Sequence, residues 1–599
     1  MDSMDKSEAP TTSAWSDLVE EASDPARVPA LAAVDSRDTL RAALSADPSV
    51  GYRRDSSTCS SQLEQLVVNL KTNVQKLLHA LIKSLELRET KRSLKLVSKC
   101  SYPKICIQLG GGARPFAQIP GPRALPLVGN AWRFLPLVGQ YAVERLDEVM
   151  VSLGRHGRLA RFSGLVGHPD LVFLFDARLV AHVLRREDAC PHRPAMPSIQ
   201  HYKARMRKHF FGETPGLIGV HGEPWERFRA QVQQPLLEAG AARRYVPALQ
   251  QVADDFLHRV HEMRDENQEL PADFIDELYT WALESVARVA LDRRLGCLSA
   301  DAVSREEPRA ILAAIKDFFP LVAHVELRLP LWRLVATPAF NRYITALDTF
   351  TRVCLKYINE AIERIRDTPG SEDRADREKS IIEKILEKTS DPKVAAILAL
   401  DMLLVGVDTT SVAAASTLYQ LSRNPEKQAA LLQELRRALP TPRSPLSAAH
   451  LEGLPYLKAC IKETLRMYPV IIGNGRCLQS DAVIEDFHIP KGTHVIFPHL
   501  CLGRSERYFP QPAAFLPERW TAAWPGGRLP DHQHASLPFG HGRRMCVGRR
   551  FAEAELQILI AKIVRRYQVE YHYGEIKYKV HPTYVPESPL KFRLVSRPN

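Results

Sequence analysis

The sequence of 599 residues lacks the patterns that mark small secreted, zinc-binding or repetitive proteins. Its ten cysteines are scattered and include no Cys-x-x-Cys pair, which disfavours a disulfide framework and a zinc ribbon. After residue 118 there is neither an internal repeat nor a low-complexity tract. No Gly-x-Gly-x-x-Gly motif follows an expected strand, so we predict no flavin- or nicotinamide-binding module.

The composition is that of an ordinary globular protein. Hydrophobic residues make up 45% and charged residues 25%, which excludes a wholly disordered or fibrous chain. Lys and Arg number 81 and Asp and Glu 69, so the net charge is 81 − 69 = +12. This modest excess does not by itself choose among a nucleic acid, a membrane surface and an acidic protein as partner. A chain this long can bury a core without disulfides, so we expect mostly free thiols in a reducing compartment.

Residues 1–118 differ from the rest and are predicted to form a largely disordered extension. Residues 1–50 carry ten acidic and four basic side chains, whereas residues 51–118 carry four acidic and twelve basic ones. Apolar residues recur at three- and four-residue steps within 61–94, which predicts a basic amphipathic helix. That helix is either a solvated tail or an organelle-targeting segment, although an acidic start is atypical of targeting peptides. No N-terminal membrane anchor is predicted.

From residue 119 onward the pattern is mainly helical. The run Gln118-Ile119-Pro120-Gly121-Pro122 forms a stiff turn and marks the boundary. Short β segments are expected at 171–175 and 494–497. We therefore predict one mainly α domain with small β-sheets, an α+β fold, over residues 119–599.

One cysteine has a setting unlike the other nine. Cys546 lies within the Gly-rich stretch from Phe539 to Gly548, and a good helix pattern begins at Arg550. Unpaired N–H groups at a helix N-terminus and the neighbouring Arg543 and Arg544 are expected to lower the pKa of this thiol. The resulting thiolate would be either a metal ligand or a nucleophile, for which His541 is the only near base.

The spacing Phe539-x-x-Gly542-x-Arg544-x-Cys546-x-Gly548 resembles the heme-binding loop of the cytochrome P450 monooxygenases. The resemblance implies that Cys546 is the axial thiolate ligand of heme b, that Phe539 shields the sulfur and that Arg544 pairs with a heme propionate. It extends over residues 119–599. It further implies the triangular, helix-rich heme domain of that family, with O2 as co-substrate.

Two further groups agree with the resemblance. Glu463 and Arg466 alone would be interpreted as a surface salt bridge. Together with Arg519 they resemble the family's Glu–Arg–Arg triad, which implies a structural role. A predicted helix places Trp225 and Arg229 four residues apart, where packing is the plain alternative. The resemblance implies that these two residues and Arg476 also bind the heme propionates.

Residues 394–422 form a long, nearly apolar segment whose only charges are Asp401 and Asp408. Two acids disfavour a transmembrane span, so we predict a buried central helix. The stretch from Gly406 to Thr410 resembles the oxygen-activation groove of the family, which implies that Thr409 hydrogen-bonds the bound oxygen while Asp408 relays protons. A mere helix kink is the alternative. The family usually has Ala or Gly where Val405 stands, and this branched side chain could narrow the groove.

Electrons must reach such a domain from another protein, and the resemblance favours the mitochondrial members over the microsomal ones, which use a diflavin reductase. Three features support this interpretation: the missing anchor, the paired Arg549 and Arg550, and the two lysines Lys458 and Lys462 on one predicted helix. They imply a small acidic ferredoxin, reduced by an NADPH–ferredoxin reductase, that docks on the two lysines. A solvated helix face is the alternative. The implied location is the matrix side of the mitochondrial inner membrane, with peripheral membrane contact.

Four further segments look similar to invertebrate mitochondrial members of the cytochrome P450 family: 193–197, 210–212, 220–225 and 282–285. The implied function is insertion of one oxygen atom of O2 into a lipophilic, steroid-like substrate, and no nucleic acid is expected as a partner. A heme-thiolate isomerase acting on a peroxide, or a heme protein without catalysis, is the alternative. The Asp408-Thr409 pair favours the monooxygenase, because relatives that do not activate oxygen tend to lose it.

Overall fold

The computed structural model describes residues 112–598, apart from 126–127, 136–138, 166, 194, 368–378, 523, 525–531 and 588. The predictions for residues 1–111, including the amphipathic helix at 61–94, lie outside the described residues. The boundary at residue 118 between an extension and a domain therefore stays a prediction.

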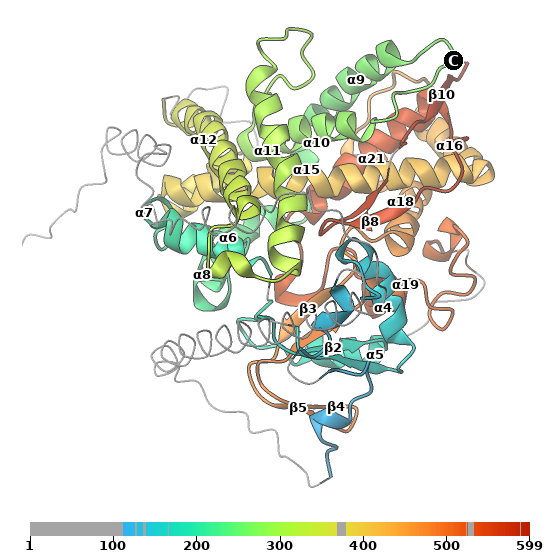
Figure 1. Cartoon of the computed structure of the whole chain (residues 1–599). Helices are drawn as coiled ribbons and strands as arrows, with labels where there is room; N and C mark the ends of the chain where they lie inside the picture. The colour runs from blue at the N-terminus through green and yellow to red at the C-terminus, as the bar shows by residue number, and fades with distance from the viewer. Residues whose placement is uncertain are drawn as a thin grey trace, which may run out of the picture. The chain divides into compact units, whose positions relative to one another are not determined.

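The described chain is mainly helical with small sheets, which confirms the predicted fold class (Figure 1). The helices of its first part are α4 (Leu146–Gly154), α5 (Ala177–Arg185), α6 (Pro197–His201), α7 (Lys208–Phe211), α8 (Gly222–Leu237), α9 (Val246–Met263), α10 (Ile275–Leu291), α11 (Glu306–Leu327) and α12 (Pro338–Asp367). Its second part contributes α14 (Ile381–Thr389), α15 (Pro392–Arg423), α16 (Pro425–Ala438), α17 (Ala448–Glu452), α18 (Pro455–Met467), α19 (His499–Gly503), α20 (His532–Ala535) and α21 (Arg549–Arg566).

Four small β-sheets complete the fold. The largest has the strand order β1-β2-β6-β3, with parallel pairing only between β2 and β6. Its strands are β1 (Leu159–Phe162), β2 (Leu171–Leu174), β6 (His494–Phe497) and β3 (Asn474–Cys477). The two-stranded antiparallel sheets pair β4 (Ala482–Ile484) with β5 (Phe487–Ile489), β8 (Tyr578–Val580) with β9 (Tyr584–Pro586), and β7 (Tyr567–Glu570) with β10 (Arg593–Ser596).

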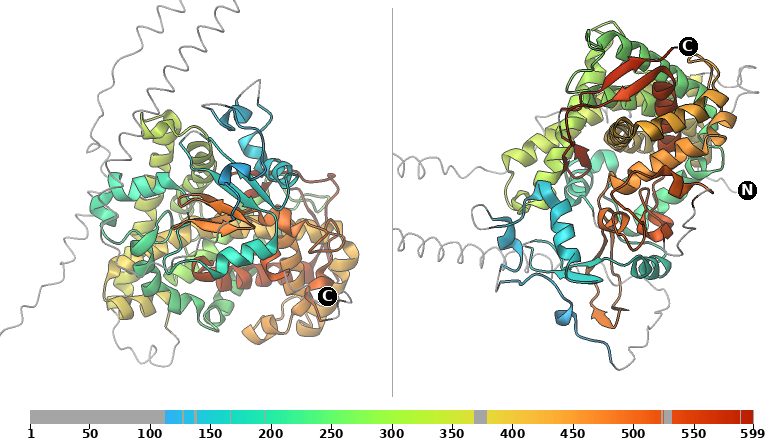
Figure 2. Two further views of the ribbon diagram at one scale, coloured as in Figure 1. Left: turned by 90° about the horizontal axis from the view of Figure 1, so that it is seen from below. Right: turned by 90° about the vertical axis from the view of Figure 1, so that its right-hand side faces the viewer.

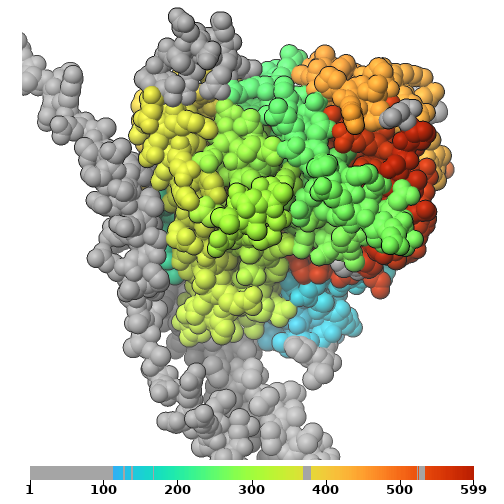
Figure 3. Space-filling view, turned by 90° about the horizontal axis from the view of Figure 1, so that it is seen from above, coloured from blue at the N-terminus to red at the C-terminus, as the bar shows by residue number. Residues whose placement is uncertain are grey.

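The sheets and helices occupy different parts of the described body. Figure 1 shows α15 crossing it, with α10, α11 and α12 packed around α15 and the four-stranded sheet with α4 and α5 in the lower part of the view. Figure 2 shows strands from the start and the end of the described chain, cyan and orange, side by side in that sheet. In Figure 3 the helices α9 to α12, green to yellow, cover a continuous face beside segments from the C-terminal part.

The central helix α15 is predicted correctly from its apolar composition. The Asp391 side chain caps its first turn by accepting from the N–H of Lys393 at 2.9 Å, and Pro425 follows its end. It is the one described helix long and apolar enough to cross a membrane, but 78% of its most apolar window is buried inside the protein. Its first acid is neutralised, because Asp401 pairs with Lys203 at 2.9 Å. α15 is therefore a core helix.

Candidate functional site

The Gly-rich loop of residues 539–548 forms a closed turn in front of α21. The N–H of Cys546 donates to the carbonyl oxygen of Phe539 at 2.9 Å, which closes the loop. Gly542 has a φ of +71°, and a Cβ there would lie 2.1 Å from Oε1 of Glu187. Only glycine fits this left-handed, crowded position. Gly542 thus lets the loop approach Glu187 closely.

The thiol of Cys546 borders a gap inside the protein. Cys546 alone is exposed among the seven cysteines that the structure describes. The surrounding protein nevertheless desolvates the thiol, and this burial raises its pKa. A thiol that is accessible and yet desolvated borders an interior gap and not the outer surface of the protein.

The sequence-based expectation of a lowered thiol pKa is wrong in its net direction. Burial is the largest effect and raises the pKa, whereas the N–H groups of Gly548 and Arg549 lower it. The guanidinium groups that lower it most are those of Arg193 and Arg229, rather than those of the predicted Arg543 and Arg544. Arg543 is instead exposed and donates to the carbonyl of Ala189 at 3.2 Å.

Buried arginines gather around this gap. Arg544 stacks on Trp225 at 3.6 Å from the ring centroid, and it donates to the carbonyls of Pro191 at 2.8 Å and Val220 at 3.0 Å. Arg229 lies on α8 one turn after Trp225, and its Nε donates to Gln233 at 3.2 Å. These contacts fix the three predicted side chains Trp225, Arg229 and Arg544 in one region.

Arg476 joins the same region from strand β3. It pairs with Glu187 at 2.7 Å and donates to the carbonyl of His541 in the Gly-rich loop at 3.3 Å. A fourth arginine, Arg193, was missed by the sequence analysis. Its pKa is lowered by burial and by the charge of Arg476, while Cys546 raises it. The local sequence only weakly indicates a site residue here, because Arg193 stands in an irregular Pro-rich segment with no helix face to group it with the others.

The arginine cluster has the charge that an acidic cofactor requires. Burial, and then repulsion from Arg193, lowers the pKa of Arg544 to about 9. Burial is also the main reason why the pKa of Arg229 falls to about 10. Buried like charges destabilise each other unless an anion compensates them. The two carboxylates of a heme fit this cluster, which offers three arginines besides the one paired with Glu187.

One turn in the middle of α15 keeps accessible surface, on one face only. Between residues 394 and 421, all side chains are buried except those at Val405, Gly406 and Thr409. Positions i, i+1 and i+4 share one face of a helix, so one turn of α15 faces a gap. Thr409 donates its hydroxyl to the carbonyl of Val405 at 2.8 Å. Val405 borders the gap itself, so its branched side chain occupies space there.

Asp408 lies beside that face and is almost fully buried, with 2% of its surface exposed. Its Oδ1 accepts a short hydrogen bond from the hydroxyl of Tyr279 on α10. Burial raises the pKa of Asp408 to about 6, and the hydroxyls of Tyr279 and Thr583 oppose this rise. Sequence reasoning missed Tyr279, because a tyrosine on an apolar helix face reads as packing.

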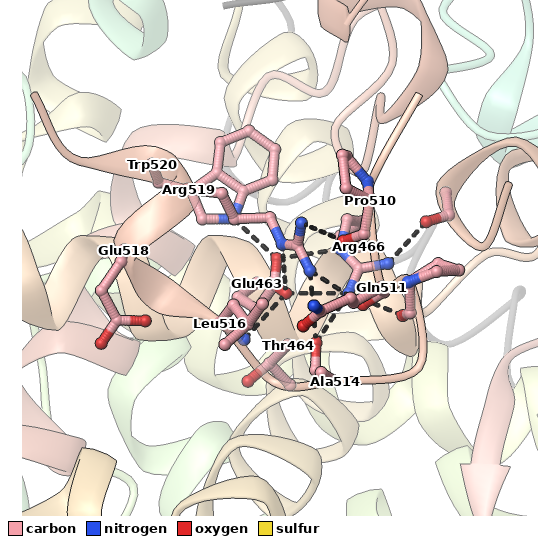
Figure 4. A network of polar contacts seen from close by, with 12 residues as sticks. Glu463, Thr464, Arg466, Pro510, Gln511, Ala514, Leu516, Glu518, Arg519 and Trp520 are labelled. Carbon is pink, nitrogen blue, oxygen red and sulfur yellow. Dashed lines mark hydrogen bonds and ion pairs between the residues drawn. The ribbon is translucent and has the colours of Figure 1, made fainter. Parts of the chain in front are cut away.

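The predicted triad forms a fully buried network (Figure 4). Glu463 accepts two hydrogen bonds from Arg466, both at 2.8 Å, and one from Arg519 at 2.9 Å. The indole of Trp520 and the N–H of Leu516 also donate to Glu463, at 2.8 and 3.1 Å. The surface salt bridge suggested by the isolated helix spacing is thus excluded for this pair.

The two arginines of the triad tie the segment before the Gly-rich loop to α18. Arg466 donates to the carbonyls of Gly503 at 2.6 Å and Pro512 at 2.9 Å, and Arg519 donates to that of Pro510 at 2.7 Å. Figure 4 shows Pro510, Gln511 and Ala514 around the two guanidinium groups. The arrangement can hold chain segments together but offers no group to a substrate.

Lys458 and Lys462 lie on the opposite, outer part of α18. Lys462 is exposed, and Lys458 is half-buried with its ammonium donating to the carbonyl of Glu452 at 3.0 Å. Arg550 of α21 is also exposed. The predicted lysine pair is therefore accessible to a macromolecular partner.

A metal at Cys546 would receive few ligands from the protein. In the part of the chain that the structure describes, no group of three or more His, Cys, Asp or Glu side chains could hold a metal ion. A thiolate that supplies one axial ligand, with a macrocycle supplying the others, matches this arrangement. A zinc site, which needs three or four protein ligands, does not.

Comparisons with known proteins point the same way. The sequence model of the family described as cytochrome P450 matches residues 119–594. A Drosophila melanogaster protein named probable cytochrome P450 49a1 is 52% identical over 492 residues, 81% of this chain and 83% of that protein. Probable cytochrome P450 301a1, mitochondrial, from the same organism is 45% identical over 484 residues, 80% and 87% of the two chains. Probable cytochrome P450 12a5, mitochondrial, is 36% identical over 499 residues, 81% and 92% of the two chains.

Proposed function

The chain belongs to the cytochrome P450 family, and we propose that it is a mitochondrial monooxygenase that oxidises a lipophilic, steroid-like substrate with electrons from a ferredoxin. Membership of the family makes it a heme b enzyme with O2 as co-substrate. The names of two relatives place those proteins in mitochondria, which supports the same location here. The observation that carries the proposal is the setting of Cys546, a desolvated thiol that borders an interior gap.

In this proposal the residues around the gap hold the heme. Cys546 supplies the thiolate, which the N–H groups of Gly548 and Arg549 stabilise by hydrogen bonding. The heme propionates are bound by one tryptophan and four arginines: Trp225, Arg193, Arg229, Arg476 and Arg544. The ring of Phe539, half-buried beside the guanidinium of Arg549 at 5.6 Å, limits access of water to the sulfur. When bound, heme supplies the activation of O2 and the oxidation of a C–H bond.

The protein's own task in the reaction is to deliver protons. Asp408 is buried and its pKa of about 6 lies near neutrality, so it can both hold and release a proton at working pH. Thr409 lies next to it on the face of α15 that borders the gap, with its hydroxyl directed to the carbonyl of Val405. We assign a role to each residue. Thr409 orients a hydrogen bond into the gap, and Asp408 supplies a new proton after one has been delivered there. This pair favours the monooxygenase over the isomerase or the non-catalytic heme protein.

The outer face of α18 is the proposed docking site of an acidic ferredoxin. Lys458 and Lys462 lie four residues apart on α18, the first half-buried and the second exposed. Exposed positive charges steer an acidic partner and set its association rate. An NADPH–ferredoxin reductase would reduce that partner.

An apolar surface at the α11–α12 connection supports peripheral contact with the inner membrane. Five of the eleven exposed large apolar side chains in the described residues lie in this short stretch: Leu327, Leu329, Leu331, Leu334 and Val335. Apolar side chains beside the basic Arg328 and Arg333 suit an interface with anionic lipids. The change Leu329→Ser with Val335→Ser should reduce flotation of the protein with cardiolipin-containing vesicles. Unchanged flotation would count against this contact.

The substrate can be tested by reconstitution. Purified protein with heme, ferredoxin, ferredoxin reductase and NADPH should convert one member of a sterol and secosteroid panel to a product that carries one oxygen atom from O2. Thr409→Ala should bind the same substrate but consume NADPH with release of peroxide instead of product. Conversion of an organic peroxide without NADPH or O2, unaffected by Thr409→Ala, would favour the isomerase.

A further inference from the structure

The two oxygens of the Asp408 carboxyl have different surroundings. Oδ1 accepts the hydroxyl of Tyr279, whereas buried Oδ2 has no hydrogen-bond partner among the described residues. The hydroxyl of Thr583, in the turn between β8 and β9, is also buried and also lacks a partner among those residues. Thr583 nevertheless lies close enough to lower the pKa of Asp408. Two unpartnered polar atoms thus lie near each other in the core.

Tyr279 is held firmly in its position. Its helix α10 packs along α15, and the hydroxyl of Ser411 joins the two helices by donating to the carbonyl of Leu278 at 3.0 Å. On its outer side, the ammonium of Lys316 lies 6.0 Å from the Tyr279 ring centroid and pairs with Asp276 at 2.7 Å. The Tyr279 hydroxyl is therefore held in its hydrogen bond to Oδ1 of Asp408.

A buried polar pair of this kind suits one bridging water. Buried waters typically make two to four hydrogen bonds to polar groups that otherwise lack partners. Oδ2 of Asp408 and the hydroxyl of Thr583 provide two such groups. Leaving both without a partner would cost the desolvation free energy of each.

We propose that Tyr279 is a positioning residue for proton delivery. Because its hydroxyl donates a hydrogen bond to Oδ1 of Asp408, the proton is exchanged at Oδ2. The exchange passes through one water that Oδ2 shares with Thr583. A proton leaves Oδ2 toward the side of α15 that carries Thr409. An equal proton returns to Oδ2 by way of the water and the buried Thr583 hydroxyl, from the β8–β9 turn whose neighbouring residues His581 and Pro582 are half-buried. No electron moves in this exchange. The inference rests on the proposed monooxygenase function, because it explains how the gap receives protons.

The titratable groups around Asp408 are few. Tyr279 faces it from α10 and Thr583 from the β8–β9 turn, and both stabilise the ionised carboxylate against the effect of burial. Asp276 acts on Tyr279 and not directly on Asp408. Removal of the Tyr279 hydroxyl should therefore raise the pKa of Asp408.

The test is a pH titration of the carboxylic C=O band of Asp408 by infrared difference spectroscopy on the heme-loaded protein. The wild-type band should titrate near pH 6 and be missing in Asp408→Asn. In Tyr279→Phe its midpoint should rise by about one to two pH units, because a hydrogen bond to a charged group contributes about 1.5–3 kcal/mol. Ser285→Ala, which removes another buried hydroxyl from α10, is the matched control and should leave the midpoint unchanged. An unmoved midpoint in Tyr279→Phe would overturn the proposal.

Thr583 provides a second, independent arm. Thr583→Val should raise the midpoint and increase several-fold the share of NADPH consumed without product, with a larger solvent isotope effect on turnover. Thr583→Ser keeps the hydroxyl and should behave as wild type. If Thr583→Val and Thr583→Ser show the same midpoint and the same share of unproductive NADPH consumption, Thr583 does not take part in proton delivery. If the infrared midpoints shift as expected while no substrate is ever oxidised, the proposed function fails, and only the hydrogen bond by which Tyr279 sets the pKa of Asp408 is confirmed.

Discussion

At the scale of single residues, the buried carboxyl of Asp408 destabilises the folded protein at neutral pH. Burial raises the pKa of Asp408 from 3.8 to about 6, so the ionised carboxylate is disfavoured in the folded state. A shift of about two units corresponds to roughly 3 kcal/mol at neutral pH. The sign follows from linkage: this cost is absent below pH 3.8, grows as the pH rises through the interval, and is complete above pH 6.

Asp408→Asn should therefore stabilise the protein while impairing proton delivery. We expect the free energy of unfolding at pH 7 to rise by about 2–3 kcal/mol, because a neutral amide can still accept the Tyr279 hydroxyl without carrying a buried charge. The gain should vanish below pH 4, where the wild-type carboxyl is protonated in both states. Denaturant unfolding at the two pH values measures this. A variant that is equally stabilised at both would show that the charge of Asp408 is not the cause.

Single residues differ in how well the sequence reveals them. Cys546, Arg544 and Phe539 are spaced along one short loop, so a linear pattern identifies them. Arg193 and Tyr279 come from separate segments and meet the site only in three dimensions, so nothing in their local sequence groups them with it. The pKa of the Cys546 thiol was misjudged for the same reason, since burial depends on the whole surrounding protein.

At the scale of elements, a few buried ionic contacts join segments that are far apart in the sequence. The triad links α18 with residues 503–520, and Arg476 with Glu187 links β3 with the segment after α5. Glu463 is the only acid that faces Arg466 and Arg519 within the described residues. Removal of one partner from a buried ion pair leaves an uncompensated charge.

Glu463→Gln should consequently lower the free energy of unfolding by about 3–5 kcal/mol, since two buried guanidinium groups lose their countercharge. Glu553→Gln is a suitable control, because Glu553 forms a half-exposed ion pair with Arg549 and its loss should cost less than about 1 kcal/mol. Chemical denaturation of both variants measures the difference. A small effect in Glu463→Gln would mean that the network does not stabilise the fold.

The elements themselves follow from the sequence where periodicity is strong. The central helix and the β segments at 171–175 and 494–497 are found within two residues of their predicted bounds. The connection between them is harder to predict, because the pairing of β2 with β6 joins residues more than 300 positions apart. No local pattern encodes such a pairing; it depends on which faces remain to be covered once the helices have packed.

At the scale of the whole molecule, the proposed function uses two different parts of the surface. The proposed ferredoxin site is the basic outer face of α18, and the proposed membrane contact is the apolar α11–α12 connection. Separate surfaces would let the protein remain at a lipid interface while its redox partner exchanges. The sequence revealed the lysine pair, whereas the apolar surface became apparent only from exposure in the folded structure.

The change Lys458→Gln with Lys462→Gln should raise the ferredoxin concentration needed for half-maximal turnover by several-fold. The cause is the loss of electrostatic attraction, so the dependence of turnover on salt should also flatten. Lys356→Gln with Lys379→Gln removes two exposed charges elsewhere and is the matched control. Folding and peroxide-driven turnover should remain near wild type in both double variants. Efficient support by a diflavin reductase, with none from ferredoxin, would contradict the mitochondrial assignment.

The central claim is that Cys546 is the thiolate ligand of a heme. The most direct measurement is the absorption spectrum of the reduced, carbon monoxide-bound protein, compared between wild type and Cys546→Ala. Wild type should show the red-shifted Soret band of a heme-thiolate protein, and Cys546→Ala should lose that band. A red-shifted band that persists in Cys546→Ala, or that is missing from correctly folded, heme-loaded wild type, would contradict the account.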